Sequence, residues 1–418
     1  MRLVLATPSS VPRDVVERIE GMGFEVEVAV VYDLEREPLE LARSCRDCMV
    51  IVPGSTPYKY PEGSRVVKGT YSPLTLPYLL EEVEPSRLSP IIPAEKVLPP
   101  DTVARVFARI LQGLRRSYER AFNIRGLGVP LKPPPILVAS EVYVNRGVDM
   151  VVEASWRLAE GADIVVLGAL GAGEEGLLRA LDRVKDAVKA PIGVDPANRS
   201  LLRTLASIGA DLLMSLELDP KNPPDLSWVP SDAGIVLIPP SPIDMGVWDT
   251  VSWMEGACRR ALEVGVNAIV DPVVLRPGAP RGPLVALAST LMAGKDLRCP
   301  VMLGLNNVYE MLDADTQGSI AALTMLAGEA GASLLLVGEE SWKSRWATLE
   351  ARLAADMASI SLHTGTPPKD LGFNLLPWKG KRENEGAAGS TPCTLSWEGL
   401  RMYLEALGVR DGGPQGSA

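Results

Sequence analysis

Histidine and cysteine, the two residue types on which many catalytic and metal sites depend, are scarce in this chain. Among 418 residues there is one histidine, His363, and there are five cysteines. A single histidine excludes a histidine-rich metal site and argues against a Ser-His-Asp triad. Five cysteines are too few for a disulfide framework, and the CRDC pair, Cys45 and Cys48, lacks the second Cys or His pair of a zinc site. We therefore expect no metal site.

Long apolar runs and an excess of basic residues are also missing. No run reaches the roughly 20 apolar residues of a membrane span, and the start MRLVLATPSSVPRD lacks the features of a cleaved leader. Lys and Arg number 42 against 52 Asp and Glu, which gives a net charge of -10 and a pI near 5.0. Because nucleic-acid grooves need clustered Lys and Arg, we expect neither nucleic acid nor membrane as a partner. The sequence predicts a cytoplasmic protein that acts on small molecules.

The first part of the chain alternates between strand and helix patterns. The strands are MRLVLATP, EVEVAVV and CMVIVPG, and helical patterns lie between them. This order predicts a small doubly wound, Rossmann-like α/β domain. A helix around 101–121 and the proline-rich GVPLKPPP follow, and the restricted backbone of that segment suits a stiff linker. We expect residues 1–130 to hold this domain and its linker helix.

Eight short apolar runs follow the linker, with helical patterns between them. They are mostly continuous rather than alternating, as in parallel strands that are buried on both faces. The runs cover 136–140, 163–169, 191–195, 211–217, 234–239, 267–272, 300–305 and 333–338. Eight β-then-α units in about 225 residues have the size and rhythm of a (β/α)8 TIM barrel. We expect the barrel over residues 131–360 and a C-terminal extension over 361–418, with its last residues disordered.

Polar residues at the C-terminal ends of the eight strands are the candidates for chemistry, because TIM barrels carry their sites there. Most are acids, amides or hydroxyls: Ser140, Glu141, Asn145, Asp195, Asn198, Glu217, Asp219, Ser241, Asp244, Asp271, Arg276, Asn306, Asn307, Glu339, Glu340 and Lys343. Such a rim suits a ligand with many N–H donors better than a phosphorylated sugar. The alternative for each residue is a helix N-cap, where Asp, Asn and Ser are favoured.

The loop after the second barrel strand contains a possible dinucleotide motif. GAGEEG, with Gly171, Gly173 and Gly176, matches G-x-G-x-x-G, and Asp195 follows about 20 residues later. Two acids, Glu174 and Glu175, would face the pyrophosphate at the helix N-terminus, where like charge is unfavourable. The strand is also second in a series of eight rather than the first of a six-stranded sheet. We therefore do not expect a nicotinamide cofactor.

Three segments resemble the pterin-binding barrel superfamily, which includes dihydropteroate synthases and the methyltetrahydrofolate and tetrahydromethanopterin methyltransferases. APIGVDPANRSLLRTLASIGADLLMS is similar to the third strand and following helix of that superfamily, and AIVDP to its sixth-strand aspartate motif. VMLGLNNVYEM is similar to the Gly-Leu-Ser-Asn seventh strand of the methyltransferases. The layout of the whole chain, including DLGFNLLPWKGKR at 370–382, resembles the archaeal dihydropteroate synthase-related proteins.

The resemblance implies pterin contacts, and catalytic roles, for Asp195, Asp271 and Asn307. A carboxylate accepts hydrogen bonds from both the 2-amino group and N3-H of a pterin, while an amide contacts ring nitrogen N5 in either protonation state. The predicted substrate-binding residues are Asp195, Asn198, Asp271, Asn306, Asn307, Glu339 and Lys343. For the residues after the eighth strand, contact with a second substrate or the pterin tail competes with a surface salt-bridge cluster.

Departures from the synthases favour methyl transfer over condensation. The Asn-Val-Thr-Pro-Asp-Ser-Phe loop of the synthases, which binds pyrophosphate, is replaced here by ASEVYVNRG. Their second-strand aspartate, fourth-strand asparagine and seventh-strand Ser-Arg-Lys align with Val166, Met214 and residues 306–308. We expect transfer of a methyl group from N5 of tetrahydromethanopterin or tetrahydrofolate, in which the leaving nitrogen needs a proton or a strong hydrogen bond. Synthase-type condensation and a non-catalytic pterin-binding scaffold are the alternatives.

The resemblance also implies partners. A corrinoid protein or another methyl acceptor would take the methyl group, and barrels of this family often look like homodimers. The N-terminal domain shows neither an Asp-x-His-x-x-Gly segment nor a P-loop, so its role stays open.

Overall fold

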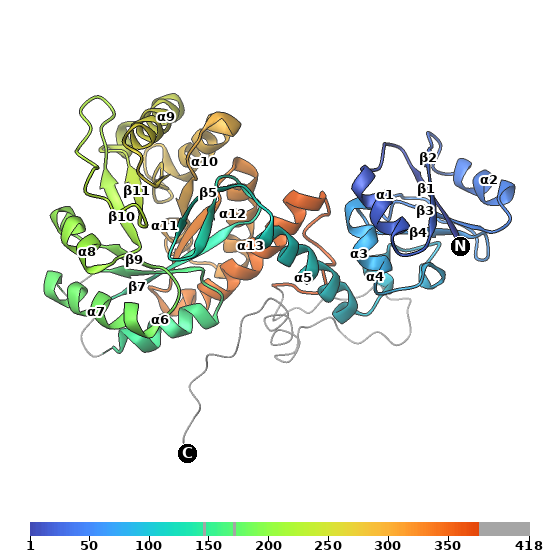
Figure 1. Ribbon diagram of the computed structural model, residues 1–418, viewed down its shortest axis with the longest axis horizontal. Helices are drawn as coiled ribbons and strands as arrows, with labels where there is room; N and C mark the ends of the chain where they lie inside the picture. The colour runs from blue at the N-terminus through green and yellow to red at the C-terminus, as the bar shows by residue number, and fades with distance from the viewer. Residues whose placement is uncertain (145–147, 170–172, 376–418) are drawn as a thin grey trace, which may run out of the picture. The chain divides into compact units, whose positions relative to one another are not determined.

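The computed structural model describes residues 1–144, 148–169 and 173–375, and it forms two compact units (Figure 1). The first comprises Met1–Gly113 together with the described residues from Ile360 onward, and the second comprises Leu114–Ser359. Most of the predicted C-terminal extension therefore lies outside the described residues. No helix in the described part of the chain is both long enough and apolar enough to span a membrane.

The N-terminal unit is built on a parallel sheet with the strand order β2-β1-β3-β4. Its apolar strands alternate with helices, as the sequence pattern predicts, and β4 is an additional strand. The strands are β1 (Arg2–Thr7), β2 (Glu25–Val30), β3 (Cys48–Val52) and β4 (Val66–Lys68). The helices are α1 (Arg13–Glu20), α2 (Glu37–Ser44), α3 (Leu76–Leu80), α4 (Ala94–Val97) and α5 (Pro100–Arg116).

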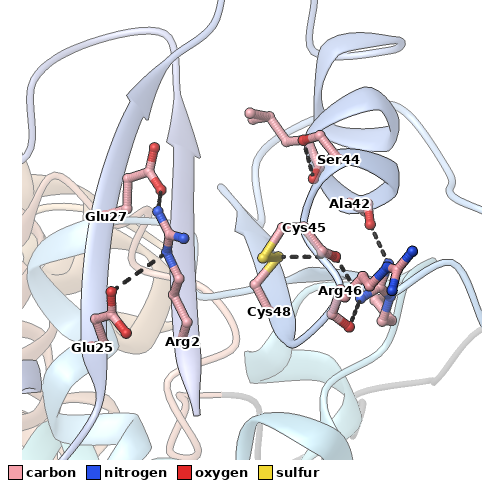
Figure 2. Close-up of a disulfide and its surroundings, with 10 residues drawn as sticks. Arg2, Glu25, Glu27, Ala42, Ser44, Cys45, Arg46 and Cys48 are labelled. Atoms are coloured by element: carbon pink, nitrogen blue, oxygen red, sulfur yellow. Dashed lines mark hydrogen bonds and ion pairs between the residues drawn. A yellow bond between two sulfur atoms is a disulfide. The ribbon is translucent and has the colours of Figure 1, made fainter.

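Two disulfides are present, although the cysteine count did not suggest a framework. One joins Cys45 and Cys48, between the end of α2 and the start of β3 (Figure 2). The guanidinium of Arg65 donates to the backbone carbonyls of Ala42, Cys45 and Arg46, and a cation is favoured at a helix C-terminus. The CRDC segment therefore closes a helix end. The second disulfide, Cys258–Cys299, joins residues 41 positions apart, a pairing that sequence spacing does not reveal.

The larger unit is a closed barrel of eight parallel strands in the order β12-β11-β10-β9-β8-β7-β14-β13. A parallel bridge between Val270 and Val301 joins the two ends of this sheet, so the predicted (β/α)8 barrel is confirmed. Each strand overlaps one predicted run, and β7 extends three residues beyond the predicted end at 140. The strands are β7 (Leu137–Tyr143), β8 (Ile164–Gly168), β9 (Ile192–Asp195), β10 (Leu212–Glu217), β11 (Gly234–Ile238), β12 (Ala268–Val270), β13 (Met302–Gly304) and β14 (Leu334–Gly338).

Helices follow these strands along the chain, and most of them form the outer layer in Figure 1. They are α6 (Met150–Ala159), α7 (Gly173–Ala187), α8 (Leu202–Ile208), α9 (Val247–Val264), α10 (Gly282–Ala293), α11 (Asn306–Tyr309), α12 (Thr316–Ala330) and α13 (Ala347–Thr364). Left-handed glycines end three of them, at Gly209, Gly265 and Gly331, where a β-carbon would be strained. Each of these glycines lies three residues before the start of the next strand, at β10, β12 and β14.

A β-hairpin fills the base of the barrel, where the sequence predicted a helix end and a linker. Its strands are β5 (Arg120–Ile124) and β6 (Leu127–Pro130), and Ile124 and Val129 belong to the buried core of the barrel. Gly234, the first residue of β11, faces this hairpin, because an added β-carbon would lie 3.3 Å from the ring of Phe122. The hairpin therefore belongs to the barrel unit, which begins at Leu114 within α5 rather than at the predicted residue 131, and the base is a packed floor.

Side-chain alternation along the strands defines what lies at the opposite end. Leu137 and Ala139 of β7 point into the core, so the period of two places Glu141 on the same inner face. By the same rule, Ile269 leads to Asp271, whereas Asn306 is the first residue of α11 and is buried there. The apolar interior therefore changes to acids and amides at the C-terminal ends of the strands.

Candidate functional site

Glu141 is a buried carboxyl group at this end of the barrel, with 7 % of its surface exposed. Its neighbour on β8 is Gly168, where an added β-carbon would lie 2.4 Å from Glu141 Oε1, so only glycine leaves room for the carboxyl. The hydroxyl of Tyr143 lies 3.2 Å from Glu141 Oε2. Burial, reinforced by the negative charge of Asp195, raises the pKa of Glu141 to about 8. Glu141 therefore keeps its proton at neutral pH.

Asp195 ends β9, and its carboxylate accepts a hydrogen bond from the guanidinium of Arg199, one helical turn later. Arg199 also donates to the carbonyl of Pro196 at 2.7 Å, which holds the guanidinium beside the strand end. No N-cap hydrogen bond of Asp195 is present among the described residues, and Asn198 caps the short 3-10 helix Arg199–Leu201 instead. Asp195 is therefore an ion-paired, partly exposed acid on the inner face.

Asp271 follows β12 and holds a sharply bent loop. Its Oδ1 accepts the backbone N–H of Val273 at 2.7 Å, and Val273 has a φ of 63°, a strained conformation for a β-branched residue. Burial raises the pKa of Asp271 to about 7, the Val273 N–H opposes the shift, and the charge of Asp195 adds to it. The two predicted aspartates are therefore close enough to repel each other.

The two asparagines after β13 have different environments. Asn306 is buried, with 6 % of its surface exposed, and its Oδ1 has no hydrogen-bond partner among the described residues. Its Nδ2 lies 3.5 Å from Glu340 Oε1. Asn307 is exposed and donates from Nδ2 to the carbonyl of Val274 at 2.9 Å, which ties α11 to the loop of Asp271. Asn306 thus presents the unused amide oxygen, whereas Asn307 braces the loop.

Three other predicted substrate-binding residues have structural partners elsewhere. Asn198 is an N-cap whose Nδ2 donates to Glu174 at 2.7 Å. Glu339 pairs with Arg157 at 3.0 Å. Lys343 donates to the carbonyls of Tyr309 and Glu310 at 3.1 and 2.9 Å. These contacts engage each side chain away from the acids, so the structure does not bring the three residues into the group around Asp195 and Asp271.

The group that the structure does bring together is Glu141, Tyr143, Asp195, Asp271, Asn306 and Glu340, with Arg199 beside it. Glu141 and Glu340 were on the predicted rim but not among the chosen site residues, and Tyr143 was missed. Leu137 and Ala139 face the core, and extending this two-residue alternation along the same strand would have identified Glu141 and Tyr143. Asn145 and Gly171 lie outside the described residues. In the described part of the chain, no three or more His, Cys, Asp or Glu side chains are placed to hold a metal ion.

The raised pKa values predict how stability depends on pH. Burial raises the pKa of Glu141 and Asp271. It also raises the pKa of three other acids, Glu95, Glu160 and Glu350. An acid whose pKa is higher in the folded than in the unfolded state stabilises the fold most at low pH, and this stabilisation declines between about pH 4 and pH 8. We expect a melting temperature roughly 5 to 10 °C lower at pH 8.5 than at pH 5.5, measured by calorimetry. Glu141→Gln should flatten this dependence, and an unchanged slope would contradict the assignment.

No family model matches the chain. An uncharacterized protein of Methanocaldococcus jannaschii is 28% identical over 247 residues, which are 54% of this chain and 45% of that protein. The match therefore spans less than half of the relative's length.

Solved structures that are similar include a dihydropteroate synthase from Thermus thermophilus, with 21% identity and a TM-score of 0.44 over 56% of this chain and 96% of that one. A Yersinia pestis dihydropteroate synthase with a pterine-sulfa conjugate has 17% identity and a TM-score of 0.46, over 58% and 99% of the two chains. The order of the eight parallel strands and the bridge between Val270 and Val301 establish the barrel independently of these similarities.

Proposed function

We propose that this protein is a pterin-dependent transferase that binds a reduced pterin at the C-terminal end of the barrel and transfers a methyl group from it. The observation that carries the proposal is the proximity of Asp195 and Asp271, two acids on separate strands within electrostatic reach of each other. Paired N–H donors on one edge of a heterocycle are matched by carboxylate oxygens. The motifs GVDP, IVDP and GLNN support the same ligand.

The polar atoms that remain unused fit such a ligand. Asp271 uses Oδ1 for Val273, and we assign its Oδ2 to the pterin N–H groups. Asn306 Oδ1 is buried without a partner among the described residues, which is costly unless a donor binds there. A reduced pterin supplies donors of this kind. In this proposal Asn306 contacts the ring, and Asn307 acts through the loop that it braces.

Charge in the group also favours a donor-rich or cationic ligand. Asp195, Asp271 and Glu340 lie near the protonated Glu141, and Arg199 is the paired cation of this group among the described residues. A methylated ring nitrogen leaves only after it gains a proton or a strong hydrogen bond, and nearby acids stabilise that positive charge. The reaction that we propose is one-carbon transfer to a nucleophilic acceptor, with a corrinoid protein as the predicted partner.

A ligand titration tests the function against its alternatives. We expect tetrahydromethanopterin or tetrahydrofolate, and their N5-methyl forms, to quench the intrinsic fluorescence of the protein, without competition from inorganic pyrophosphate. Competition by pyrophosphate would indicate condensation of the dihydropteroate synthase type, because that reaction needs a pyrophosphate site. Binding of none of the four pterins would contradict both the proposed function and the pterin-binding scaffold. Comparing the two pterin classes in the same assay identifies the natural one.

We also propose that the protein forms a homodimer through the outer faces of α10 and α12. Helix α10 has no charged residue over its twelve positions, and α12 has only Glu329. Large apolar side chains on these helices are exposed: Leu284, Leu291, Met292 and Leu326. Exposed apolar faces of this kind mark interaction sites, and an uncharged face is complementary to a second copy of itself.

The dimer prediction has a simple test. Leu291→Glu should convert the dimer to a monomer, measured by light scattering after size-exclusion chromatography, because it introduces a charge into an apolar interface. Leu262→Glu, an exposed residue on α9, is the matched control and should leave the mass unchanged. A monomeric wild-type protein, or a dimeric Leu291→Glu variant, would contradict the proposed surface.

A further inference from the structure

Tyr143 lies between two carboxyl groups, and its single hydroxyl proton cannot serve both. Its oxygen is 2.8 Å from Glu340 Oε1 and 3.2 Å from Glu141 Oε2. A phenol donates one hydrogen bond, whereas an ionised carboxylate donates none. If both acids were ionised, the oxygen lone pairs of one would face those of the phenol without a hydrogen between them. One of the two acids must therefore carry the second proton.

The surroundings decide which acid it is. Glu340 is exposed to solvent, and its Oε1 also lies within 3.5 Å of Asn306 Nδ2, so two donors and water stabilise its ionised form. Glu141 is 7 % exposed and has no donor of its own except the shared phenol among the described residues. The charged groups that face Glu141 are Asp195 and Arg199 from the end of β9 and Glu340 from the end of β14. The acids outnumber the arginine, and burial favours the neutral form.

We propose that Glu141 is the proton donor of the site, and that Tyr143 and Glu340 return a proton to it from solvent. This inference rests on the proposed function for the identity of the acceptor atom, the leaving ring nitrogen. The proton passes from the Glu141 carboxyl group to that nitrogen, the carbon–nitrogen bond breaks with its electron pair left on nitrogen, and the methyl group joins the nucleophilic acceptor. Glu340 then takes a proton from water and passes it through the phenol, and Glu141 is neutral again.

The first experiment measures the proton on Glu141 in the ligand-free protein, so it does not depend on the reaction. Infrared difference spectra between wild type and Glu141→Gln should contain the carbonyl band of a protonated carboxylic acid at pH 7. The band should disappear as the pH rises through about 8, the pKa that burial and Asp195 give this group. Absence of the band at pH 7 would overturn the proposal, even if the protein binds and converts pterins.

The second experiment measures turnover and binding together. Glu141→Gln should lower turnover by about 100-fold, the usual contribution of an acid catalyst, while pterin affinity changes by less than about threefold. Tyr143→Phe should lower turnover by about tenfold and leave the infrared band of Glu141 in place, because it interrupts the return of the proton but not its storage. Full turnover in both variants would overturn the relay. Failure of wild type to bind any pterin would refute the proposed function alone, since the infrared result stands by itself.

Discussion

Replacing Asp271 by alanine is expected to weaken the binding of a reduced pterin by about 100-fold or more. The substitution removes a carboxylate that, in our proposal, accepts two N–H groups of the ligand, and each bond to a charged acceptor contributes about 1.5 to 3 kcal/mol. A loss of about 1.4 kcal/mol corresponds to a factor of ten in the dissociation constant. The measurement is the fluorescence titration with N5-methyl pterin at pH 7.

Companion variants separate ligand contact from loop support. Asp271→Asn keeps an oxygen for the Val273 N–H, so it should preserve the strained loop and still lose affinity. Asn198→Ala, the N-cap residue, is the matched control on the same rim and should bind normally. Asn306→Ala should lose more affinity than Asn307→Ala, because only Asn306 has a buried, unused oxygen. Unchanged affinity in both Asp271 variants would remove this residue from the site.

The largest expected effect on stability comes from Arg352, which is 3 % exposed in α13. It donates to Asp163 at 2.9 Å, to the carbonyl of Ile136 at 3.3 Å and to Asp356. Asp163 in turn accepts the backbone N–H of Val138. The network therefore joins α13 to the beginnings of β7 and β8. Removing Arg352 takes an ion-pair partner from the two largely buried acids Asp163 and Asp356, so Arg352→Leu should lower the free energy of unfolding by about 3 to 5 kcal/mol.

Chemical denaturation measures this loss, with an exposed ion pair as the matched control. Arg183 and Asp149 form such a pair, with side chains 65% and 50% exposed. Arg183→Leu should therefore change the free energy of unfolding by less than about 1 kcal/mol. If Arg352→Leu were as stable as this control, the network around Asp163 would have no structural role.

The sequence predicts the strands of the barrel well and its end segments less well. Continuous apolar runs identify buried parallel strands, and each of the eight predicted runs overlaps a strand, although β7 continues past its run to Tyr143. The hairpin of β5 and β6 was missed because its prolines and glycines match a linker equally well, and only tertiary packing places Ile124 and Val129 in the core. The disulfide of Cys258 and Cys299 depends on proximity across 41 residues, which local patterns do not contain.

The site shows how far strand periodicity extends and where it ends. Asp271 follows a regular strand, and the period of two places it on the inner face. At β13 the strand ends at Gly304 and α11 begins at Asn306, so successive side chains then turn by about 100° rather than about 180°. Which of two adjacent asparagines points inward depends on where that change occurs, and sequence patterns locate element ends only to within a few residues. The motif resemblance selected Asn307, whereas the structure buries Asn306.

The packed floor made by β5 and β6 has a consequence for the order of events in catalysis. Because the hairpin closes one end of the barrel, the two reactants of the proposed function would share the opposite, C-terminal end as their approach to the group around Asp195 and Asp271. Two reactants that share one opening must arrive in sequence, and the one that lies deeper enters first and departs last. Steady-state kinetics should therefore follow a compulsory order, with the acceptor approaching over the pterin, and a protein acceptor would need to cover the mouth rather than enter it.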